Sequence, residues 1–102
     1  MSDKAWKQTE RKIAAILGGR RVPITGRQRG DVPDIAHDWL SPEVKHRQKL
    51  PAWIHDAMNQ AVSAAKSDQL PIVVLHEKGK SHTSDLVVIQ LGDFQDWFGD
   101  PQ

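Results

Sequence analysis

The residues best suited to chemistry lie between positions 33 and 47, where Asp34 is followed nine residues later by the run Glu43-Val44-Lys45. Residues two apart on a β-strand point to the same face. A strand through this run would therefore place Glu43 and Lys45 side by side and turn Val44 toward the core. The pattern predicts a carboxylate and an ammonium group that act together.

A tight hairpin would bring Asp34 to the same face. If the turn is centred between Asp38 and Trp39, position 34 pairs with position 43, and the two carboxylates lie about 5 Å apart. Two carboxylates this close repel each other unless a cation joins them, and their hard oxygens favour Mg²⁺ or Mn²⁺. Such a centre, with Lys45 beside it to stabilise charge or orient water, suffices for phosphodiester hydrolysis.

A third carboxylate, Glu10, lies on the apolar stripe of a helix predicted over residues 4–17. A carboxylate at this position needs an ionic partner, a metal ion, or a place at the edge of the stripe. Glu10 could complete the metal coordination if this helix packs across the hairpin. The apolar residues of the stripe are Trp6, Ile13, Ala14 and Leu17.

The competing interpretation of the Asp34 and Glu43-Lys45 pattern is a surface salt bridge, because this spacing is common by chance. Four features favour a site: the proline before Asp34, the hairpin register, the position of Glu10, and the apolar strands predicted further along the chain. We therefore expect a functional site.

The elements that must position these residues follow the order α-β-β-β-α-β-β-α, which predicts an α/β fold with a mixed central β-sheet flanked by helices. The chain is expected to be a single domain over residues 1–102. The runs at 71–77 and 86–91 are almost wholly apolar, which is typical of strands covered on both faces. The predicted elements are a helix at 4–17, strands at 20–24, 33–37 and 40–46, a helix at 51–67, strands at 71–77 and 86–91, and a helix at 94–98 capped by Asp93.

The composition is that of an ordinary globular protein, with 38% hydrophobic and 26% charged residues. The net charge is only +1, but residues 20–49 contain seven Lys or Arg against four acidic residues, a local balance of +3. The absence of cysteine excludes disulfides and thiolate metal sites. With no apolar run of membrane-spanning length, we expect a soluble, cytoplasmic protein.

The chain resembles the PD-(D/E)xK nuclease superfamily, especially its small Holliday-junction-resolvase-like and phage endonuclease branch. The resemblance rests on "TERK" in the first helix, "GDVPDI", and "EVKHR". It implies a restriction-endonuclease-like core, Mg²⁺ held by Asp34, Glu43 and the Val44 carbonyl, Lys45 as catalytic lysine, and Glu10 as the helix carboxylate. Some members carry a glutamine on the following helix; Gln60 is the candidate, and an ordinary exposed glutamine is the alternative.

The expected partner is DNA, and a homodimer would suit a four-way junction because such a junction needs two symmetric nicks. The alternatives are a nicking or restriction-type nuclease on linear duplex, and a non-catalytic DNA-binding subunit. Histidine spacing indicates no zinc site. Simple solvation is the alternative for the predicted DNA contacts, which are Arg27, Arg29, His46, Arg47 and the stacking residue Trp39.

Overall fold

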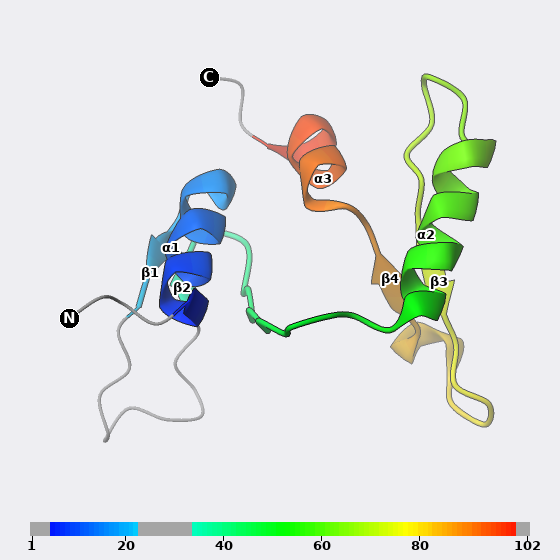
Figure 1. Cartoon of the computed structure of the whole chain (residues 1–102), viewed down its shortest axis with the longest axis horizontal. Coiled ribbons are helices and arrows are strands. Elements are labelled where there is room, and N and C mark those ends of the chain that lie inside the picture. Colours follow the sequence, from blue (N-terminus) through cyan, green and yellow to red (C-terminus); the bar gives the residue numbers. More distant parts are fainter. Residues whose placement is uncertain (1–4, 23–33, 100–102) are drawn as a thin grey trace. The chain divides into compact units, whose positions relative to one another are not determined.

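The computed structural model of the chain describes residues 5–22 and 34–99 (Figure 1). These residues form two compact units, residues 1–48 and residues 49–102, and each is described by itself. We call them unit 1 and unit 2. Whether the two units form the single domain expected from the sequence stays a prediction.

Unit 1 begins with helix α1 (Ala5–Leu17), as the apolar stripe predicted. The helix ends at Gly18, whose φ of 81° lies in the left-handed region that glycine adopts without strain. The amide of Gly19 then donates to the carbonyl of Ala14 at 2.8 Å, which satisfies one of the free carbonyls at the helix end. The chain thus turns directly from α1 into the first strand.

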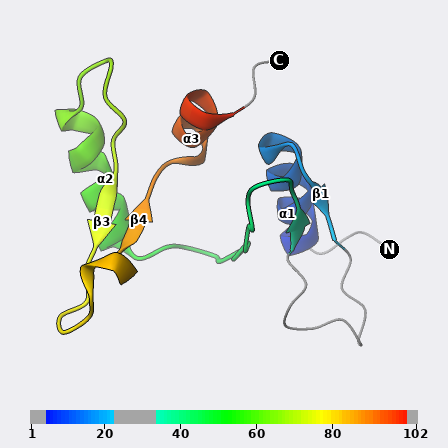
Figure 2. The same cartoon turned by 180° about the vertical axis from the view of Figure 1, so that it is seen from behind.

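Strands β1 (Arg20–Arg21) and β2 (Ile35–Ala36) form an antiparallel pair in which Arg21 lies opposite Ile35. α1 packs against β1 (Figure 2). Ile35 is fully buried. Gly19 lies so close to β2 that a Cβ atom at this position would be 2.4 Å from the Ala36 carbonyl oxygen. Only glycine permits this approach.

The strand predicted over residues 40–46 is wrong, since these residues contain no strand. β2 pairs with β1 instead, and side chains take the backbone N–H groups that a hairpin ladder would use. The ring of His37 accepts from the amides of Trp39 and Leu40 at 3.3 and 3.2 Å. The carboxylate of Asp34 accepts from the amide of Val44 at 2.7 Å.

Unit 2 contains the remaining elements, and β3 pairs with β4 in an antiparallel register of Val73 with Val88 and Leu75 with Leu86. Helix α2 lies beside β3 in both views (Figures 1 and 2). The helix predicted over residues 51–67 is shorter in the structure: Pro51 immediately precedes α2, which ends at Ala64. The elements are α2 (Ala52–Ala64), β3 (Val73–Leu75), the 3₁₀ turn η1 (His82–Ser84), β4 (Leu86–Val88) and α3 (Leu91–Phe98).

The predicted α/β class is confirmed, but several details differ. The described strands form two separate antiparallel pairs rather than one mixed sheet. Val74, Leu86 and Val87 each expose more than half of their surface, so unit 2 does not cover both faces of its strands. Helix α3 begins after Gln90, and Asp93 lies in its first turn rather than at the cap.

Across residues 5–22 and 34–99, none of the helices combines the length and the apolar character that a membrane crossing requires.

Candidate functional site

Asp34 is buried, with 7% of its surface exposed, as is Glu10. Its Oδ2 atom accepts the hydrogen bond from the Val44 amide at 2.7 Å. Asp34 thus contacts the Glu43–Lys45 run through a hydrogen bond between its side chain and the Val44 backbone, and not through paired strands. The carbonyl of Asp34 accepts from the Val22 amide at 2.8 Å, which fixes this residue at the end of β2.

Glu43 and Lys45 point to the same side of the chain, where they form an ion pair of 3.3 Å between Oε1 and Nζ. Their side chains are 61% and 65% exposed. An ion pair this exposed contributes at most about 1 kcal/mol, because water screens both charges. Both groups can therefore exchange this contact for another at little energetic cost.

Glu10 is buried on α1 and has an ionic partner in the described structure. The Nε atom of Arg21 donates to its Oε1 at 2.7 Å, and the two side chains are only 14% and 9% exposed. The guanidinium also lies over the ring of Trp6, 5.7 Å from its centroid. Arg21 thus supplies the partner that a carboxylate on an apolar stripe needs, which the sequence did not identify.

Helix α1 contacts the segment that follows Asp34, although this segment does not form the predicted hairpin. Thr9 Oγ1 and His46 Nδ1 form a hydrogen bond of 2.7 Å. Beside it is a pocket of about 260 Å³ that carries one acidic and three basic or potentially basic side chains. The pocket is lined by Trp6, Glu10, Val44, Lys45, His46 and Arg47.

The three predicted carboxylates do not converge on one point: within the described parts of the chain, Glu10, Asp34 and Glu43 form no group of metal-ligand spacing. The donor set nevertheless fits a hard divalent cation. Asp34 uses Oδ2 for the Val44 amide, and Glu43 forms an exposed ion pair with Lys45, two residues further along the chain.

The predicted DNA contacts are only partly described. Arg27 and Arg29 lie outside the described residues. Trp39 is 62% exposed and forms a T-shaped contact with the ring of His37, with centroids 5.9 Å apart. Arg47 is exposed on the pocket and donates to the His46 carbonyl at 3.3 Å. Gln60 is exposed on α2 in unit 2.

A second cluster, His76, His82 and Asp85, was missed by the sequence analysis. It is the one group of three potential metal ligands among the described residues, and its ligand atoms all lie within 4.8 Å of one another. A search for short, regular histidine spacings cannot find it, because β-strand pairing brings these residues together. The available signal was the register of β3 and β4, which places the residues just beyond Leu75 and Leu86 opposite each other.

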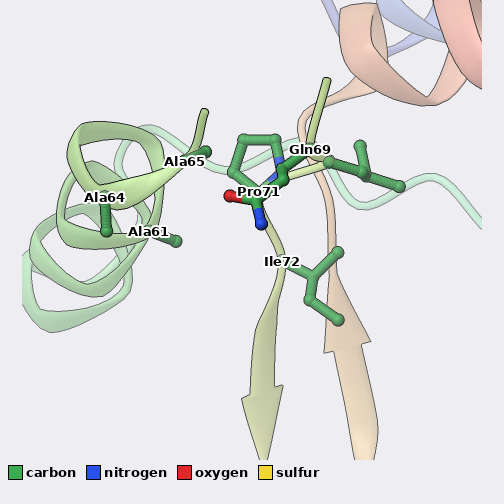
Figure 3. A pocket seen from close by; sticks show the side chains of 7 residues that line it. Ala61, Ala64, Ala65, Gln69, Pro71 and Ile72 are labelled. Atoms are coloured by element: carbon green, nitrogen blue, oxygen red, sulfur yellow. The ribbon is translucent and has the colours of Figure 1, made fainter. Parts of the chain in front are cut away.

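A pocket in unit 2 lies between the end of α2 and the segment that leads into β3 (Figure 3). Its lining includes Ala61, Ala64 and Ala65 from the end of the helix, and Pro71 and Ile72 from the following segment. Gln69 Oε1 accepts from the Lys66 amide at 2.9 Å. Its lining contains no titratable side chain. This pocket offers no group for catalysis.

The comparisons with known proteins add no family. No protein-family model matches the chain, and searches of curated proteins and of solved structures returned no significant match.

Proposed function

We propose that the chain is a magnesium-dependent DNA endonuclease with a restriction-endonuclease-like core and its site in unit 1. The observation that carries this proposal is the pocket of unit 1, which is lined by Glu10 of α1 and by residues 45–47. Val44 also lines this pocket, and its amide donates a hydrogen bond to Asp34. One carboxylate and three basic or potentially basic side chains, contributed by segments far apart in the sequence, thus line one pocket, which supports the proposal.

The carboxylates of Asp34 and Glu43 and the carbonyl of Val44 would hold the metal. Bound Mg²⁺ supplies a Lewis acid for the scissile phosphate and a water of lowered pKa. The exposed ion pair between Glu43 and Lys45 must open for Glu43 to take part, which costs at most about 1 kcal/mol. Glu10 would keep its ion pair with Arg21 through Oε1. Because Glu10 also lines the pocket, we include it among the residues that would contribute to metal coordination.

Lys45 has two functions in the proposed mechanism. Released from Glu43, its ammonium group stabilises the negative charge that develops on the phosphate and orients the attacking water. His46 and Arg47 line the same pocket and would bind neighbouring phosphates, together with Arg27 and Arg29. The exposed ring of Trp39 would stack on an unpaired base.

The substrate we propose is branched DNA, with a homodimer as the acting species. Unit 1 is small, so one copy can contact few phosphates, and few contacts give weak binding. Two copies would double the basic surface and place one site on each of two opposing strands of a four-way junction. Cleavage of linear duplex by a nicking or restriction-type reaction is the alternative within the same chemistry.

A specific observation favours a second candidate, a non-catalytic DNA-binding subunit. Each of the three carboxylates already has a partner: Arg21 for Glu10, Lys45 for Glu43, and the Val44 amide for Asp34. A site of this kind could bind phosphates with its basic residues and never recruit a metal. The two candidates differ in one measurable property, which is strand cleavage in the presence of Mg²⁺.

The test is a cleavage panel of linear, flapped and four-way DNA with Mg²⁺, comparing the wild-type chain with Lys45→Ala. The matched control is Lys12→Ala, which removes an exposed lysine of α1 that does not line the pocket. The nuclease proposal expects cleavage by the wild type and the control and its loss in Lys45→Ala. Binding without cleavage by all three proteins would establish the non-catalytic subunit instead.

A further inference from the structure

The loop that joins β3 to β4 gathers two histidines and an aspartate at its base. His76 Nδ1 lies 2.7 Å from Asp85 Oδ1, and His82 Nδ1 lies 3.1 Å from Asp85 Oδ2. The two imidazole rings stack with their centroids 4.2 Å apart and an interplanar angle of 29°. The Asp85 carboxylate therefore contacts two imidazole nitrogens, one with each of its oxygens.

Local structure fixes each of the three residues. Leu75 pairs with Leu86 at the ends of β3 and β4, so His76 and Asp85 occupy the next positions of the two facing chains. The turn η1 places His82 close to Asp85, because the Asp85 amide donates to the His82 carbonyl at 3.1 Å. The Ser81 side chain caps this turn by accepting from the Thr83 amide.

The ordinary interpretation is that Asp85 only accepts hydrogen bonds from two neutral imidazoles. These bonds would stabilise the loop between β3 and β4. That interpretation accounts for each pair separately, but not for two nitrogens directed at one carboxylate from stacked rings. Both Nδ1 atoms must carry a proton for it to hold. A divalent cation would replace both protons with one centre of charge and use the same three side chains.

The spacing of the donor atoms suits such a cation. With metal–ligand bonds of about 2.0–2.1 Å, two ligand atoms of a tetrahedral zinc site lie about 3.3 Å apart. The nitrogen–oxygen distances here are 2.7 and 3.1 Å. These two distances go to different oxygens of Asp85, and one ligand atom from each of the three residues lies within 4.8 Å of the other two. The His82 side chain, 83% exposed, is the one free to adjust its position around a cation.

We propose that His76, His82 and Asp85 bind a zinc-class divalent cation. Two imidazole nitrogens and one carboxylate oxygen favour Zn²⁺ or Co²⁺ over Mg²⁺, which prefers oxygen ligands alone. The site is thus distinct in chemistry from the magnesium site proposed in unit 1.

Three protein ligands leave a fourth coordination position for water or a small anion. Room for it exists, because His76 and Asp85 also line a pocket of about 390 Å³ that includes Lys80. The His82 side chain is 83% exposed, so a metal ion can enter directly from solvent. The bound ion would link the two ends of the loop and so hold β3 and β4 in register.

The test is a Zn²⁺ titration of the full chain by calorimetry, in competition with a chelator of known affinity and without DNA. We expect one tight site in the wild type and a loss of at least about tenfold in affinity for His82→Ala, since even residues behind metal ligands contribute about 10–100-fold. His55→Ala is the matched control, because His55 is an exposed histidine of the same unit. Its Zn²⁺ affinity should equal that of the wild type.

Co²⁺ replaces Zn²⁺ in a second measurement that reports geometry. The wild type and His55→Ala should give the intense visible absorption of a four-coordinate site, whereas Asp85→Asn and His82→Ala should not. Circular dichroism of the metal-free variants tests whether they are folded, and we expect the His82 variant to be folded because this side chain is 83% exposed. Equal Zn²⁺ affinity and equal Co²⁺ spectra in the wild type and His82→Ala would overturn the proposal.

Discussion

Replacement of Arg21 by methionine tests how unit 1 tolerates the carboxylate of Glu10. The variant removes the guanidinium that donates to Glu10 Oε1 at 2.7 Å while keeping an unbranched side chain of similar length. Glu10 would then be a buried charge without a partner. The change also removes the guanidinium that lies over the ring of Trp6.

The expected loss of stability follows from the burial of the pair. Removal of one partner of a buried ion pair costs about 3–5 kcal/mol. The lower end applies here, because the side chains of Arg21 and Glu10 remain 14% and 9% exposed. A loss of about 3 kcal/mol corresponds to a decrease in Tm of roughly 15 °C for a chain of this size.

The assay is urea denaturation followed by far-UV circular dichroism, with Arg20→Met as the matched control. Arg20 is the neighbouring residue of β1 and is exposed, so its replacement should change stability by less than about 0.5 kcal/mol. The double variant Glu10→Gln/Arg21→Met removes the unpaired charge and should recover part of the loss. The coupling energy from this cycle isolates the contribution of the pair.

Equal destabilisation by Arg21→Met and Arg20→Met would refute the reasoning, because only Arg21 contacts Glu10 in β1. Mg²⁺ adds a further distinction. If Glu10 also contributes to metal coordination, Mg²⁺ should raise the Tm of Arg21→Met more than that of the wild type, since the cation would then neutralise the unpaired carboxylate.

The remaining predictions concern the proposed reaction. Mg²⁺ or Mn²⁺ should support DNA cleavage and Ca²⁺ should support binding with little turnover; robust cleavage in EDTA would exclude the metal mechanism. Asp34→Asn, Glu43→Gln and Lys45→Ala should each lower the cleavage rate by on the order of 100-fold or more with folding intact, and wild-type cleavage by Lys45→Ala would show that its assignment is wrong. Light scattering at micromolar concentration should show a homodimer, and mapping on an immobile four-way junction should show paired nicks. A monomer with equal activity on linear duplex would contradict the junction preference.

Helices were the most predictable part of the fold, because their signals are local. The apolar stripe placed α1 correctly, with its end at Leu17. The helix predicted over residues 51–67 corresponds to α2, which covers Ala52–Ala64. The apolar runs around β3 and β4 were also identified, although the strands cover only residues 73–75 and 86–88.

The hairpin failed because strand pairing is decided by competition between segments. Residues 40–46 have a strand-like pattern, but Asp34 and His37 take their nearby amides through side-chain hydrogen bonds. β1 then supplies the backbone partner of β2. No periodicity within residues 33–47 contains that information.

The residue types of the candidate site in unit 1 could be predicted from the sequence, but most of the contacts between these residues could not. The sequence identified Glu10 as a residue that needs a partner, yet Arg21 became that partner only through the pairing of β1 with β2 and the packing of α1 on β1. The cluster of His76, His82 and Asp85 depends on strand register in the same way. Residue types can be read directly from the chain, whereas these neighbours depend on long-range pairing.

The close approach at Gly19 has a consequence for how this sequence can diverge. A methyl group there would meet both the Ala36 carbonyl oxygen and the Ile35 side chain, at 2.4 and 2.8 Å. Even alanine would push β1 away from β2 and move Arg21, two residues on, from Glu10. Gly18 is constrained for a different reason, its positive φ, and has open space around it, so asparagine is an acceptable replacement there. In a library of variants selected for stable folding, position 18 should therefore accept glycine and asparagine, and position 19 glycine alone.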